Sequence, residues 1–124
     1  MNVGQQLDRD REATLQRLAA LTRDLDVLLE ATADVPDDEH DPEGATIGFE
    51  RAQVVSLIAA ARHHLQEIDA AVERLRVGTH GTCERCGTRM SDARLLARPT
   101  ARTCVRCAES SAARRPGEPG TVRP

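Results

Sequence analysis

The stretch from residue 54 to residue 75, VVSLIAAARHHLQEIDAAVERL, places apolar side chains in alternating steps of four and three residues. The positions on this ladder are Val54, Ile58, Ala61, Leu65, Ile68, Val72 and Leu75. A repeat of about 3.5 residues is typical of a helix that buries one narrow seam against a second helix. The stretch therefore predicts a long helix that needs a helical partner.

A second ladder of this kind lies nearer the N-terminus and is interrupted by Arg11. Its positions are Leu7, Thr14, Leu18, Leu21, Leu25 and Leu28. Two such segments can bury their seams against each other as an antiparallel coiled-coil hairpin, with arms of roughly 45 Å at about 1.5 Å per residue. A compact bundle of three or four helices and a coiled coil between chains are the alternatives. We expect the hairpin within one chain, because no other part of the sequence could cover both seams.

The connection between the ladders, DVPDDEHDPEGAT at residues 34–46, carries six acidic residues and no arginine. Pro36 cannot continue a helix, so the first arm should end at the start of this stretch. Asp41 followed by Pro42 predicts an N-cap and a first helical residue, and Glu43 would complement the helix dipole. Capping does not explain Asp37, Asp38 and Glu39.

Composition and charge limit the fold and the partners of this chain of 124 residues. Phe49 is the only aromatic residue, which argues against a large globular core because aromatic side chains normally supply much of the buried area. Residues 1–76 hold eight arginines against sixteen acids, a charge of −8, whereas residues 77–124 hold nine against four, a charge of +5. The chain therefore has an acidic hairpin segment and a basic C-terminal segment.

The cysteines form the strongest motif: Cys83-x2-Cys86, seventeen residues, then Cys104-x2-Cys107. Two pairs at this spacing can close a tetrahedral four-thiolate zinc site. Such a shell leaves no open position for water or substrate, so we expect one structural zinc ion that folds a short segment. Disulfide bonds and a redox dithiol are the alternatives.

The predicted organisation has three parts. Residues 1–78 form the hairpin with its acidic tip at 34–46, residues 79–109 form the zinc-finger module, and residues 110–124, rich in Pro, Gly, Ser and Arg, form a disordered tail. The N-terminus lacks the apolar segment of a signal peptide, and the longest apolar run, VVSLIAAA, falls short of the ~20 residues of a membrane span. We expect a cytoplasmic protein, where cysteines serve more often as metal ligands than as disulfides.

Together, the hairpin, the acidic turn and the segments GTCERCG and ARTCVRCA resemble the DksA/TraR family. The resemblance extends over residues 1–109 and is closest in the zinc module, which includes ARLLARPTARTC between the cysteine pairs; DPEGAT and the following ERAQ are similar to the tip region. Asp41 and Pro42 match the family's tip, while Gly44 stands where a second aspartate is expected, so Glu43 is a candidate substitute carboxylate.

The resemblance implies a transcription regulator that binds RNA polymerase and inserts its hairpin tip into the secondary channel of the enzyme. Some members of the family act together with a guanosine tetraphosphate alarmone. On this hypothesis the tip residues that meet polymerase are Asp37, Asp38, Glu39, Asp41, Glu43, Ala45 and Thr46. An acidic tip would be attracted to basic groups that line a channel for nucleoside triphosphates.

Three other functions are compatible with parts of the sequence. The zinc module could bind nucleic acid through its arginines, but the acidic arm would repel DNA and no aromatic side chain is available there to stack on bases. A coiled-coil adaptor and a redox-sensitive zinc protein are further alternatives. We expect a monomer that is not an enzyme, because the sequence offers no nucleophile–base pair or phosphate-binding loop. The arginines of the module are Arg85, Arg89, Arg94, Arg98, Arg102 and Arg106.

Overall fold

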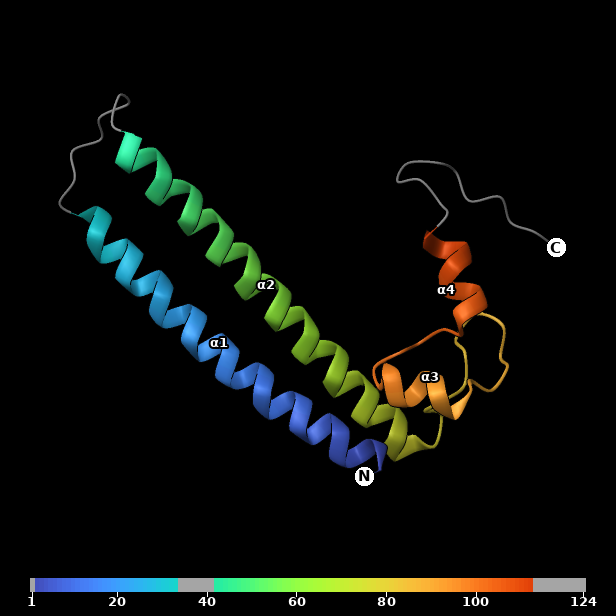
Figure 1. Ribbon diagram of the computed structural model, residues 1–124. Helices are drawn as coiled ribbons and strands as arrows, with labels where there is room; N and C mark the ends of the chain where they lie inside the picture. Colours follow the sequence, from blue (N-terminus) through green and yellow to red (C-terminus); the bar gives the residue numbers. More distant parts are fainter. Residues whose placement is uncertain (1, 34–41, 113–124) are drawn as a thin grey trace. The chain divides into compact units, whose positions relative to one another are not determined.

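The computed structural model describes residues 2–33 and 42–112 of the chain. Within these ranges the regular structure is helical, and the only β pairing is an isolated antiparallel bridge between Thr82 and Arg89. The predicted mainly helical fold class is confirmed. No helix in the described ranges is both long and apolar enough to cross a membrane. The helices in chain order are α1 (Val3–Ala33), α2 (Pro42–Val77), α3 (Asp92–Ala97) and α4 (Val105–Ala112) (Figure 1).

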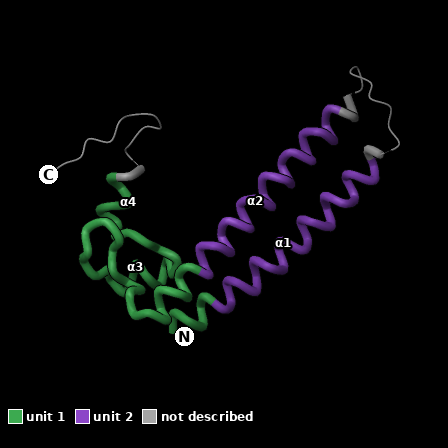
Figure 2. The backbone as a smooth tube through the Cα atoms, turned by 180° about the vertical axis from the view of Figure 1, so that it is seen from behind, with its two compact units in different colours: residues 1–7, 70–124 green, residues 8–69 purple. Residues whose placement is uncertain are grey.

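The chain divides into two compact units, which Figure 2 colours separately. One unit comprises residues 8–69, and the other joins residues 1–7 to residues 70–124. The division predicted from the sequence, at residues 78 and 109, stays a prediction. Helix α4 continues to Ala112 and so includes the first three residues of the predicted tail, because AESSA contains neither proline nor glycine to end the helix. The rest of the predicted tail lies outside the described residues.

The unit of residues 8–69 is the predicted antiparallel helical hairpin, in which α1 and α2 lie side by side (Figure 1). Thr14 of α1 and three ladder residues of α2 are buried between the helices: Ile58, Ala61 and Ile68. The buried hydroxyl of Thr14 donates to the Asp10 carbonyl at 2.7 Å, so it is satisfied within its own helix. The aliphatic ladders therefore form the hairpin core, as predicted.

Two contacts join the helices beside this core. Arg11 Nε donates to Asp69 Oδ1 at 3.1 Å, and His64 Nε2 lies 2.8 Å from Asp10 Oδ2. Arg11 is the residue that interrupts the first ladder in the sequence, and its exposed side chain reaches across to α2. The interruption is thus a cross-helix ion pair at the edge of the seam.

The helix ends follow from local sequence. Asn2 Oδ1 accepts from the Gln5 backbone N–H at 2.8 Å, while Gln5 Oε1 accepts from the Asn2 N–H at 3.1 Å, which is a reciprocal capping box. Helix α1 ends at Ala33 and α2 begins at Pro42, as predicted, although the expected N-cap Asp41 lies outside the described residues. Gly78, with a φ of 83°, ends α2 in a left-handed turn that lets the Thr79 N–H reach the Arg74 carbonyl at 2.9 Å.

The ladder predicted over residues 54–75 is wrong at its C-terminal end. Val72 and Leu75 are 42% and 38% exposed, whereas Ala71 is fully buried. From Ala70 onward the helix belongs to the other unit, where Arg74 Nη2 donates to the Thr100 carbonyl at 3.3 Å. Ala71 and Arg74 are three residues apart and share a face. The buried face of α2 therefore changes near residue 70, where the segment that packs against the helix changes. A repeat within one helix cannot reveal such a change.

This difference sets up a stability test. Ile68→Ala removes a fully buried side chain from the seam and should lower the free energy of unfolding by about 2–5 kcal/mol. Val72→Ala, four residues further along the sequence ladder, should cost under about 1 kcal/mol because its side chain is already partly exposed. Urea denaturation followed by circular dichroism measures both. Equal losses would contradict the change of face at the end of α2.

Candidate metal centre

The first cysteine pair lies in a tight turn that a short antiparallel pairing holds closed. The Cys83 N–H donates to the Thr88 carbonyl at 2.9 Å, and the Gly87 N–H donates to the Cys83 carbonyl at 3.0 Å. Gly87 has a φ of 73°, a left-handed conformation that residues with a Cβ rarely adopt. The glycine that follows the pair in the sequence therefore lets the chain fold back and place both sulfur atoms on one side of the turn.

The second pair uses a helix instead of a β-like turn. The Ala108 N–H donates to the Cys104 carbonyl at 2.9 Å, the same bond that Gly87 makes to Cys83. Here the chain continues into α4, and no non-glycine residue in the described ranges has a positive φ. Cys107 therefore lies in the first turn of α4, and an alanine suffices where the first pair requires a glycine.

The two pairs converge on one point. The four Sγ atoms of Cys83, Cys86, Cys104 and Cys107 all lie within 4.8 Å of one another, and Cys86 Sγ is 3.8 Å from Cys104 Sγ. Tetrahedral zinc with Zn–S bonds of about 2.3 Å requires sulfur atoms roughly 3.8 Å apart. Among the described residues this is the one cluster of metal-ligating side chains. Both the soft donor set and its spacing fit zinc.

Hydrogen bonds prepare some of these thiols to bind a cation. The backbone N–H groups of Cys86 and Cys104 point at the Cys83 sulfur and lower its pKa to about 6. The hydroxyl of Thr88, 2.9 Å from Cys86 Sγ, lowers the pKa of Cys86 as well. A hydrogen bond with the Cys104 sulfur and burial raise the pKa of Cys107 to about 12, because both favour its protonated form. A cation among the sulfurs would favour the thiolate instead.

Side chains outside the cysteine pairs hold the two halves of the site in register. Arg94 donates through Nε and Nη2 to the Thr103 carbonyl, at 3.2 and 3.0 Å, directly before the second pair. The Glu84 N–H donates to the Arg102 carbonyl at 2.9 Å, and Arg102 Nη1 reaches Glu84 Oε1 at 3.3 Å. From the sequence, Arg94 and Arg102 are candidates for binding nucleic acid. In the structure, both side chains make hydrogen bonds within the zinc module.

The zinc module also has a small apolar core. Met90 and Leu95 are buried together with Cys83. Ser91 caps α3 by accepting from the Arg94 N–H at 3.2 Å, which directs Leu95 inward. Gly81 is buried with a φ of 92°, and a Cβ there would lie 3.2 Å from Leu95 Cδ1, so a larger residue would disturb this core. The core is too small to fold the segment without the metal.

The structure brings the four predicted cysteines together and leaves the predicted tip mostly outside its described part. Of the tip residues, Ala45 and Thr46 are described, and both are exposed near the start of α2. His80 stays apart from the sulfur cluster, because its Nε2 donates to the Pro99 carbonyl at 2.9 Å. The described ranges do not include the tip side chains of Asp37, Asp38, Glu39, Asp41 and Glu43.

Parts of this chain are similar in sequence and fold to known proteins. Residues 78–111 match the prokaryotic dksA/traR C4-type zinc finger family. An uncharacterised protein of Aquifex aeolicus (strain VF5) is 51% identical over 45 residues, which are 36% of this chain and 31% of that protein. The matched part of this chain thus spans about a third of the length of the curated proteins that it resembles.

Two solved structures match over most of their length. The transcription factor DksA2 from Pseudomonas aeruginosa is 27% identical, with 86% of this chain and 83% of that chain covered and a TM-score of 0.52. The DnaK suppressor protein from Agrobacterium tumefaciens C58 is 32% identical, with 89% of this chain and 94% of that chain covered and a TM-score of 0.43.

The paired cysteines, the helical hairpin and the zinc-finger match define the class as proteins with a C4-type zinc finger joined to long helices. The chain belongs to the DksA/TraR family. Its cofactor is one structural zinc ion, which the four cysteines hold in a closed shell. The ion links residues before α3 to residues at the start of α4 and so stabilises the fold of the module.

Zinc binding should depend on pH in two steps. At pH 7 the Cys83 thiol is ionised, whereas Cys107, with a pKa of about 12, must lose its proton to bind. As the pH falls through about 6, Cys83 also becomes protonated, so binding must release a further proton and the affinity should fall more steeply below pH 6 than above it. Calorimetry in buffers of different ionisation enthalpy counts the protons. An equal count at pH 5 and pH 7 would contradict this assignment.

Arg94→Gln should accelerate zinc loss several-fold, because the Thr103 carbonyl loses two charge-assisted donors beside the second cysteine pair. Arg98→Gln, which removes a neighbouring exposed guanidinium, is the matched control and should leave the rate unchanged. Transfer of zinc to a chromogenic chelator measures both rates. Equal acceleration in the two variants would mean that general positive charge, and not the contact to Thr103, retains the ion.

Proposed function

We propose that this protein is a cytoplasmic transcription regulator that binds RNA polymerase directly and inserts the end of its α1–α2 hairpin into the secondary channel. The observation that carries the proposal is the antiparallel hairpin of residues 8–69, which a six-carboxylate connection joins at one end. The likeness to the transcription factor DksA2, which covers 86% of this chain, supports it.

The dimensions of the hairpin support entry into a narrow channel. Helices α1 and α2 contain 31 and 36 residues, which corresponds to about 45 to 55 Å at 1.5 Å per residue. Residues 8–69 comprise only these two helices and their connection, so this unit is one helix thick and two helices wide. A globular domain of similar mass could not deliver side chains to the end of such a channel.

Charge supports the direction of insertion. Residues 30–50 hold eight acids and no arginine, so the negative charge is concentrated around the end of the hairpin. An acidic end is steered toward basic groups or a metal ion, and carboxylates can coordinate magnesium. In this proposal the zinc module remains outside the channel, and its arginines Arg94 and Arg102 stabilise the module instead of binding DNA.

The test distinguishes a helix-capping role of Asp41 from a role of its negative charge in binding polymerase. Asparagine caps a helix about as well as aspartate, so Asp41→Asn should keep the helix content while it removes one charge from the tip. We expect a several-fold weaker effect on transcription by purified polymerase, with unchanged circular dichroism. Asp8→Asn, at an exposed position near the start of α1, removes the same charge far from the turn and should retain full activity.

Crosslinking completes this test. A photoreactive group at Thr46, which is exposed near the start of α2, should capture polymerase subunits that line the secondary channel. Repeating the assay with guanosine tetraphosphate tests whether the alarmone takes part, and sedimentation tests the proposed monomer. Suppose that Asp41→Asn leaves transcription unchanged and that Thr46 gives no crosslink to polymerase. Asp41 would then serve only as a helix cap, and the proposal would be overturned.

A further inference from the structure

Two grooves lie along the hairpin of residues 8–69, and their charges are opposite. The first, of about 360 Å³, has an apolar floor of Val27, Leu28 and Val54, and its charged lining residues are Asp24 and Glu50. No arginine or histidine lines this groove. It therefore offers two carboxylates beside aliphatic surface.

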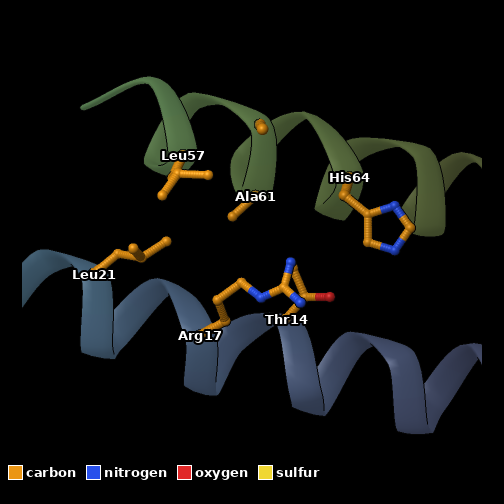
Figure 3. A pocket seen from close by; sticks show the side chains of 7 residues that line it. Thr14, Arg17, Leu21, Leu57, Ala61 and His64 are labelled. Atoms are coloured by element: carbon orange, nitrogen blue, oxygen red, sulfur yellow. The ribbon is translucent and has the colours of Figure 1, made fainter. Parts of the chain in front are cut away.

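The second groove, of about 320 Å³, lies further from the turn and carries Arg17 and His64 above an apolar floor. Figure 3 shows Leu21 and Leu57 pointing toward each other from the two helices, with Arg17 and His64 beyond them along the groove. No carboxylate lines this groove, although Asp10 Oδ2 lies 2.8 Å from His64 Nε2 at its edge. Because His64 is paired with Asp10, the guanidinium of Arg17 is the main cationic group of the groove.

Both grooves lie on the same face of the hairpin. Arg17 and Asp24 are seven residues apart on α1, and His64, Leu57 and Glu50 follow one another at steps of seven on α2. Seven residues are close to two full turns of an α-helix, so each set shares one side and its members are spaced by roughly 10 Å. The face therefore presents a cationic position and an anionic position about two helical turns apart.

Apolar side chains on this face remain exposed to solvent. Val27 is 64% exposed and Leu57 is 47% exposed, and they belong to the acidic and the basic groove respectively. Covering such side chains would be favourable in proportion to the area removed from water. The same face thus combines an apolar driving force with two charges that fix the register of a partner.

We propose that this face docks an amphipathic helix of a partner protein, with a lysine or arginine over Asp24 and Glu50 and a carboxylate over Arg17, seven residues away. Helices bind hydrophobic grooves through side chains repeated every three, four and seven residues, which matches the spacing of the two charged positions. The inference does not depend on polymerase binding, because it uses the sides of the hairpin and not its turn.

A second copy of this chain fits the face less well. Residues 8–69 contain six arginines against fifteen acids, a charge of −9, so two such hairpins would repel each other. A partner helix with a basic residue at the acidic groove is attracted instead. Each exposed ion pair contributes a factor of up to about five in affinity, so loss of both carboxylates should weaken binding on the order of tenfold.

The experiment uses the full chain and a lactam-stapled helical peptide with leucines facing the groove and Lys and Glu seven residues apart. Fluorescence anisotropy measures binding, with a Lys–Lys peptide for comparison. Wild type should prefer the Lys–Glu peptide, and Asp24→Asn with Glu50→Gln should weaken its binding on the order of tenfold. Asp26→Asn, which removes an exposed charge from another side of α1, is the matched control and should have no effect.

Exchange of specificity is the decisive result. Arg17→Glu should reverse the preference, so that this variant binds the Lys–Lys peptide more tightly than the Lys–Glu peptide. An unchanged preference, equal weakening by Asp26→Asn, or no binding of either peptide would each overturn the proposal. Self-association that disappears with Asp24→Asn and Glu50→Gln would also overturn it, because the occupant would then be a second copy. Asp41→Asn should leave peptide binding intact, which separates this face from the proposed polymerase tip.

Discussion

The hairpin depends on the burial of one narrow aliphatic seam between α1 and α2. With a single aromatic residue in 124, the chain has no large side chains to build a wider core, so its helices must supply long contacts from small ones. Ile58, Ala61 and Ile68 alternate along α2 at the spacing that keeps this contact continuous. The consequence is an extended element whose sides stay accessible, and both proposed functions use those accessible parts.

The metal centre solves the opposite problem, because its segment has few residues to bury. Met90 and Leu95 are the main apolar side chains under the cysteine turns, and they could not fold the segment alone. Hydrogen bonds from the backbone to Cys83 and from Thr88 to Cys86 already favour thiolates, while Cys107 keeps its proton. The stability of the module therefore depends mainly on the four cysteine ligands and on the arginine contacts that hold the two cysteine pairs together.

The sequence predicts best the features that depend on neighbours along the chain. The cysteine spacing and Pro42 at the start of α2 each have a local physical cause. What the sequence missed depends on contacts between separate elements: Arg94 on the Thr103 carbonyl, and Ala71 buried in place of Val72. The same holds for His64 beside Asp10, 54 residues away, because no periodicity records which side chains face each other across two helices.

The distribution of charge argues that stability alone did not shape the hairpin. Ion pairs such as Arg11 with Asp69 show that the chain places opposite charges together where it gains by doing so. In the connection it places six carboxylates with no arginine, and at most Asp41 and Glu43 assist the start of α2. Like charges placed this close in sequence repel one another, and a positive partner of the kind proposed above would relieve that repulsion. The proposed function would therefore explain a concentration of charge that helix capping alone does not.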